Sequence, residues 1–103
     1  MATAPLFTVA GTVDFRERIA LPPGAVATIK LVDTEGEVLA ATAVEVPNVP
    51  TDFTVTVDPS FVTEPGELLI WAMLRSAVGV WGTTELEPVD ATSTAVMLTK
   101  IED

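Results

Sequence analysis

The sequence predicts an all-β domain: an antiparallel sandwich of two sheets with about seven to eight short strands, like immunoglobulin or transthyretin domains. Valine and threonine, which favour strands, alternate in several segments. The eight prolines and six glycines fall between apolar stretches, where turns are expected. No window shows the apolar period of an amphipathic helix, so we expect no more than one helical turn.

The apolar segments between these turn signals give the expected strands. The cleanest alternation places Phe53, Val55 and Val57 on one face, with threonines on the other. A hairpin turn is expected at residues 33–36, because Gly36 can take a positive φ, and a helical turn is expected after Asp58. The expected strands are Phe7–Val13, Phe15–Ala20, Ala25–Val32, Glu37–Val46, Phe53–Val57, Glu67–Ser76, Val80–Leu86 and Thr94–Ile101.

The length of 103 residues corresponds to one domain, so residues 1–103 are expected to fold together, with residues 1–5 as an N-terminal tail. The absence of cysteine excludes disulfides, thiolate metal sites and cysteine nucleophiles. The absence of histidine removes the usual general base at neutral pH, and the serines have no histidine to activate them. We therefore predict no catalytic residues, no cofactor and no enzyme activity.

The charge is one-sided, with 15 acidic and 5 basic residues and a net charge of −10. Such a field repels nucleic acid and anionic lipid, so neither is an expected partner. No apolar run approaches the roughly 20 residues of a membrane helix, and direct membrane insertion is not predicted. Met1–Pro5 has no basic segment followed by an apolar one. The chain is therefore expected to be cytoplasmic as it stands, and exported or periplasmic if a leader has been removed.

The sixth expected strand is apolar on both faces, although only one face of a sheet in a two-layer domain meets the core. Its second face is therefore either covered by the chain's own loops or exposed to a partner. Tryptophan, methionine and arginine are enriched at protein interfaces. With a tryptophan from the next strand, the candidate partner-binding residues are Leu69, Trp71, Met73, Arg75 and Trp81.

Acidic residues give two weaker candidates. Asp33, Glu35 and Glu37 alternate around a glycine, which faintly resembles a calcium loop, but a hairpin turn explains them without a metal. Glu85 and Glu87 would share one face of a strand, where they could bind a cation, although a solvated strand end is the simpler interpretation. We predict no metal site from either group.

The segment Arg16–Pro23 is the most specific feature of the sequence. On a strand Arg16 and Arg18 would point the same way, and could grip a carboxylate partner or pair with the protein's own acids. With Val9–Val13 before it and Ile29–Asp33 after it, this segment resembles the opening of the YbaY/YscW-type lipoprotein family. The later segments that fit the same layout are Asp58-Pro59-Ser60, Leu68–Leu74 and Val80-Trp81-Gly82-Thr83.

The resemblance implies a compact β-sandwich. Some members of this family are pilot lipoproteins, which escort secretin subunits of type III secretion systems to the outer membrane. The lipid anchor of such proteins is attached to a cysteine, and this sequence contains none. The resemblance therefore implies a pilot-like module without the anchor.

These observations lead to a primary functional hypothesis and several alternatives. The primary one is a non-catalytic interaction or chaperone-like module that presents a sheet face or edge to another protein. The alternatives are a binder of small ligands or cell-envelope glycans, with Trp71 or Trp81 as a stacking platform, and a metal-dependent site at the acidic turns. A homodimer formed through the sixth strand is also possible.

Overall fold

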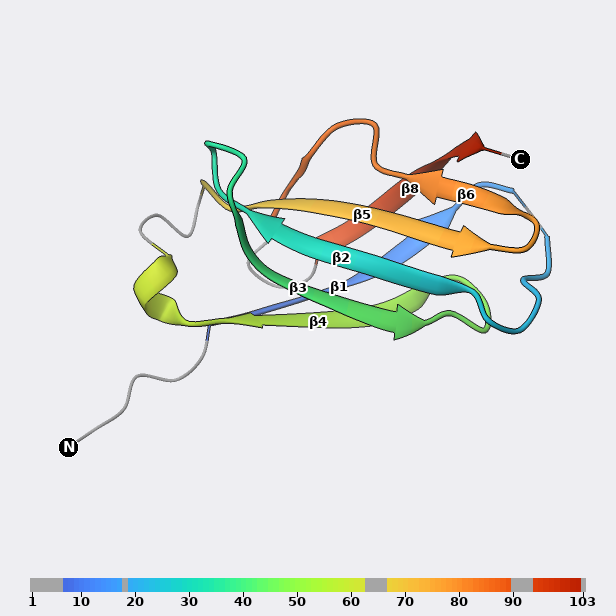
Figure 1. The fold of residues 1–103 in the computed structure, drawn as a ribbon, viewed down its shortest axis with the longest axis horizontal. Coiled ribbons are helices and arrows are strands. Elements are labelled where there is room, and N and C mark those ends of the chain that lie inside the picture. Colours follow the sequence, from blue (N-terminus) through green and yellow to red (C-terminus); the bar gives the residue numbers. More distant parts are fainter. Residues whose placement is uncertain (1–6, 18, 63–66, 90–93, 103) are drawn as a thin grey trace.

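The computed structural model describes residues 7–17, 19–62, 67–89 and 94–102, and these residues form strands and one 3-10 turn without an α-helix (Figure 1). No helix among them is long and apolar enough to cross a membrane. The elements are β1 (Phe7–Phe15), β2 (Val26–Val32), β3 (Val38–Glu45), β4 (Thr51–Val57), η1 (Pro59–Phe61), β5 (Leu69–Ser76), β6 (Gly79–Gly82), β7 (Glu87–Pro88) and β8 (Thr94–Glu102).

The strands form one continuous path in the order β3-β2-β5-β6-β8-β1-β4, and the short β7 pairs with β5. The two ends of the path, β3 and β4, lie side by side, although no ladder joins them in the described chain (Figure 1). The all-β prediction is confirmed. The predicted two-sheet sandwich is only partly correct, because the sheet curls into a nearly closed, barrel-like form.

Strand β8 changes partners along its length. Its first half pairs in parallel with β1, from Gly11↔Thr94 to Phe15↔Leu98. Its second half pairs antiparallel with β6, including Trp81↔Lys100. The expectation of purely antiparallel pairing is therefore wrong at this seam. No hairpin connects β1 to β8, so no local turn signal sets their relative direction.

Gly11 allows the close approach of β1, β4 and β8. A Cβ atom at this position would stand 2.1 Å from the carbonyl oxygen of Thr94 and 2.8 Å from the Cζ atom of Phe53. Any side chain here would therefore push apart the strands that close the barrel. The close packing of these strands thus explains why the Val9–Val13 segment has a glycine at its centre.

The core fills the inside of the curled sheet. Strand alternation supplies it, since β2 turns Ala27, Ile29 and Leu31 inward and β4 turns Phe53, Val55 and Val57 inward. The largest fully buried side chains are Trp81, Ile29, Leu31, Ile70, Leu74, Leu98, Val13, Val46, Val55 and Val96. This core places the remaining apolar side chains of β5 on the outside of the sheet.

Two expected turns are confirmed. Gly36 has a φ of 84°, and its N–H donates to the Asp33 carbonyl at 3.0 Å. The Asp58 carboxylate accepts a 2.9 Å bond from the Ser60 N–H and caps η1. That backbone hydrogen bond, with a second from the Ser60 side chain, lowers the pKa of Asp58.

Two expected strands are wrong. In the expected strand Phe15–Ala20, the described residues 16–17 and 19–20 are not in a strand, because β1 continues only to Phe15 and its pairing with β8 ends there. The strand expected to reach Leu86 ends at Gly82, and the chain pairs again only at β7. Pro88 fits this short edge position because it has no N–H to donate.

Candidate protein-binding face

Strand β5 pairs along one edge with β2, and its other edge pairs with β6 at residues 73–76 and with β7 at residues 69–70. Between these two ladders the Ala72 carbonyl accepts a bond from the Thr83 N–H, so the free surface of β5 is a face. Leu69, Trp71 and Met73 are half-buried on the outer face, and Arg75 is exposed beside them. The inward positions Ile70, Ala72 and Leu74 are fully buried. The structure therefore brings together four of the five sequence-predicted site residues.

Trp81 lies elsewhere. It pairs with the inward Leu74 and is completely buried. Its ring stacks on Phe15, with centroids 4.4 Å apart and planes 14° from parallel, and its Nε1–H donates to Glu17 Oε1 at 3.1 Å. The expectation that Trp81 extends the outer surface is wrong, because strand register places it opposite Leu74 and thus inward.

Strand register adds residues that the sequence alone did not identify. Lys30 of β2 lies opposite Trp71, and Val26 lies opposite Arg75. Val80 of β6 lies on the other side of Arg75. The alternation of β2 was visible in the sequence, but not which strand it would pair with. We call the resulting surface the outer patch: Val26, Lys30, Leu69, Trp71, Met73, Arg75 and Val80.

A hollow of about 230 Å³ opens beside Trp71. Val38 and Leu86 form part of its wall and are 49% and 41% exposed. At the opposite side of the patch Ile101 is 57% exposed, and its Cδ1 would lie 3.3 Å from a Cβ on Gly82. The chain's own loops therefore leave large apolar side chains accessible around the patch.

The patch carries positive charge on an acidic protein. The Lys30 Nζ stands 4.8 Å from the centroid of the Trp71 ring, a cation–π contact. Arg75 is exposed and makes no ion pair with any residue that the structure describes. The nearest acidic positions in the ladder are one strand further away on either side of Arg75: Glu45 of β3 across Val26, and Glu102 of β8 across Val80. None of the seven patch residues is acidic.

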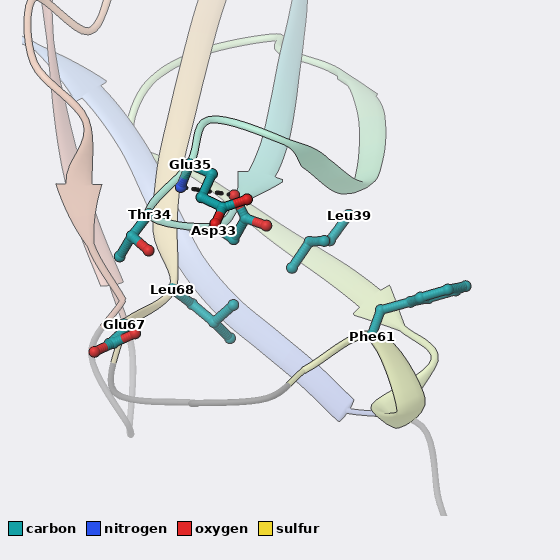
Figure 2. Close-up of a pocket in the computed structure, with 7 residues that line it drawn as sticks. All are labelled: Asp33, Thr34, Glu35, Leu39, Phe61, Glu67 and Leu68. Atoms are coloured by element: carbon teal, nitrogen blue, oxygen red, sulfur yellow. Dashed lines mark hydrogen bonds between the residues drawn. The ribbon is translucent and has the colours of Figure 1, made fainter.

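A second hollow, of about 290 Å³, lies at the Asp33–Gly36 turn (Figure 2). Asp33 Oδ1 accepts 2.9 Å bonds from the backbone N–H groups of Glu35 and Glu37, so this carboxylate holds the turn. Figure 2 shows the Phe61 ring directed away from Asp33 and Glu35. No group of three acidic side chains in the described ranges could hold a metal ion.

The third feature is the Arg16–Pro23 segment. A hollow of about 500 Å³ is lined by part of this segment and by residues 47–49; the residues of the segment that line it are Arg16, Glu17, Ile19, Ala20 and Leu21. Arg16 is exposed, and Glu17 is bound to Trp81. Arg18 lies outside the described residues. The segment thus contributes to the fold by tying the connection after β1 to the core tryptophan.

Comparison with known proteins places this geometry in a family. The model of the type III secretion system lipoprotein chaperone family YscW matches residues 4–99. No curated protein sequence matches significantly. A solved structure, an alternative pilotin from the type II secretion system of Vibrio cholerae, has the same fold: it superposes with a TM-score of 0.79 and 23% identity, covering 94% of this chain and 98% of that one. The family resemblance of the sequence is thus confirmed, and the chain belongs to the YscW family of type III secretion system lipoprotein chaperones.

Proposed function

We propose that this protein is a non-catalytic, chaperone-like module of the cell envelope that binds a secretin-type subunit of a secretion system through the outer patch. Family membership supports a chaperone role. The observation that carries the choice of surface is Trp71, which is half-buried on an outward sheet face among accessible apolar side chains. Aromatic anchors of this kind supply most of the free energy at protein interfaces.

We propose the outer face of β5 as the docking surface, and not an edge of that strand. One edge of β5 is paired with β2, and the other is covered by β6, by β7 and by the hydrogen bonds between Ala72 and Thr83, so a partner strand cannot add there. The same pairing argues against a homodimer formed by edge addition to β5. Packing of two outer patches against each other is the remaining route to a dimer, and such a dimer would compete with partner binding.

A glycan-binding function has less support. Trp81 is completely buried, and the Lys30 ammonium stands over the Trp71 ring. Stacking of a sugar requires an accessible ring face. Neither tryptophan therefore offers a ready platform.

The test compares Trp71→Ala with Phe61→Ala in binding to the purified secretin subunit of the source organism by isothermal titration calorimetry. Phe61 is a matched control, because it is an aromatic side chain 60% exposed outside the patch. Loss of a central aromatic anchor costs about 2 kcal/mol or more, so Trp71→Ala is expected to weaken binding about 30-fold. Phe61→Ala should bind like the wild type.

One result would contradict the choice of docking surface. If folded Trp71→Ala binds the secretin as tightly as the wild type, the outer patch is not the docking surface. Far-ultraviolet circular dichroism of each variant establishes that it is folded. Light scattering over a dilution series shows whether the free protein pairs through the same patch.

A further inference from the structure

We propose, building on the proposed function, that the outer patch selects a partner segment with two carboxylates that flank a row of apolar side chains. The carboxylates would pair with Lys30 and Arg75, and the apolar row would cover Trp71 and Met73. Three features of the patch lead to this inference: the sign of its charge, the spacing of its cations and the positioning of the Lys30 ammonium.

The sign of the patch is opposite to that of the protein. The chain has a net charge of −10 and only 5 basic residues, yet Lys30 and Arg75 both lie in the patch and no acidic residue does. At physiological ionic strength the Debye length is about 8 Å, so remote surface acids are largely screened. Lys30 and Arg75 are the only charged side chains among the seven residues of the patch itself.

The spacing of the two cations sets the spacing of the carboxylates. Lys30 lies opposite Trp71, and Arg75 follows Trp71 by four positions on the neighbouring strand. At about 3.3 Å per residue this separates the two cations by roughly 13 Å along the strands. A partner spans that distance with about four residue steps of extended chain, and the side chains of residues i and i+4 then share one face. On a helix, residues i and i+8 lie on the same face and stand about 12 Å apart at 1.5 Å per residue.

The apolar surface between the cations completes the recognition site. Met73 lies between Trp71 and Arg75, and Thr28 lies opposite Met73. The hollow beside Trp71 can receive one partner side chain, and Lys30 lines it as well as Trp71. A segment with apolar residues between its two acids would therefore bury them on β5 while its acids reach the cations.

The two cations are suited to carboxylates in different ways. The cation–π contact with Trp71 holds the Lys30 ammonium at the surface, so less side-chain freedom is lost when a carboxylate arrives. Arg75 can offer a bidentate pair of donors. Both charges lie beside apolar groups that exclude water on docking, which strengthens the ion pairs.

The test uses two designed helical peptides with the same Leu/Ala apolar face, one with Glu and the other with Lys at positions i and i+8, which share that face about 12 Å apart. Binding is measured by fluorescence anisotropy at about 0.15 M salt, where remote charges are screened. We expect the Glu peptide to bind at least about tenfold more tightly, a difference of about 1.4 kcal/mol. The protein's net charge taken alone predicts the opposite preference.

Charge reversal provides the controls. The double variant Lys30→Glu/Arg75→Glu should reverse the preference between the two peptides. Arg16→Glu makes the same charge change as either single substitution but lies outside the patch, so it should leave the preference unchanged. Circular dichroism shows that each variant is folded.

Equal affinities, a preference of the wild type for the Lys peptide, or no binding of either peptide would overturn the inference. The proposed function is tested separately by the dependence of secretin binding on Trp71. If Trp71→Ala weakens secretin binding but the peptides show no preference for acid, the docking face stands and the charge selection fails.

Discussion

The two tryptophans of this protein lie ten positions apart on neighbouring strands, yet they face opposite sides of the same sheet. Trp81 faces inward, stacked on Phe15 and bonded to Glu17. Trp71 faces outward, half-buried beneath Lys30. The same residue type thus packs in the core in one place and lies in the outer patch, the docking surface we propose, in the other, and strand register alone separates the two environments.

The largest expected effect is the loss of stability when the buried Trp81 is replaced. Trp81→Ala should lower the free energy of unfolding by about 3–5 kcal/mol, because it leaves a large cavity in a packed core. Urea denaturation followed by circular dichroism measures this loss. Trp81→Phe keeps a ring against Phe15 and should retain more stability. A small loss for Trp81→Ala would show that the buried stack does not hold the core together.

The next largest effect on stability tests how closely β1 packs against β8. Gly11→Ala places a Cβ against the Thr94 carbonyl and should lower stability by about 1–3 kcal/mol through overpacking. Ala10→Ser, at the exposed neighbouring position, is the control and should unfold at the wild-type urea concentration. Unchanged stability in Gly11→Ala would contradict the close approach of β1 and β8.

A smaller effect concerns the hydrogen bond of Trp81. Glu17→Ala removes the acceptor of the indole N–H and should cost about 1–2 kcal/mol, since a buried donor is left without its partner. Glu17→Gln keeps an acceptor oxygen and should restore most of the stability. Thermal unfolding monitored by tryptophan fluorescence compares the two variants. Identical melting temperatures for both would show that this bond contributes little.

The smallest expected effect on stability is on the outer side. Trp71→Ala removes a half-buried side chain and one cation–π contact, so it should lower stability by about 1 kcal/mol or less. Urea denaturation measures this change. The contrast with Trp81→Ala is the sharpest test of the two roles. A loss as large as that of Trp81→Ala would mean that Trp71 belongs to the core.

Local patterns predict much of this fold. The alternation of Phe53, Val55 and Val57 identified β4, and the turn at Gly36 followed from the demand for a positive φ. The strand predicted over Phe15–Ala20 is wrong at residues 16–17 and 19–20, because the sequence does not show where the pairing of β1 with β8 ends. The parallel direction of that pair is likewise a long-range property, which no local signal records.

The candidate site also combines features that the local sequence predicts with features that depend on strand pairing. The doubly apolar character of β5 was visible in the sequence and located Trp71 and Met73 on one face. The side of the sheet on which Trp81 lies depends on its register with Leu74, which is a tertiary property. The pairing of Lys30 with Trp71 depends in addition on which strand becomes the neighbour of β5.

The change of partner along β8 has a consequence for how the nascent chain folds. Among the described strands β1 is synthesised first and β8 last, so the edge of β1 that pairs with β8 stays unpaired until β8 has been made. Contacts between such distant segments slow folding, and an open strand edge favours aggregation. Nascent or truncated chains that lack β8 should therefore depend on chaperones that bind unfolded chains. The nine residues of β8 complete the sheet and protect the open edge of β1.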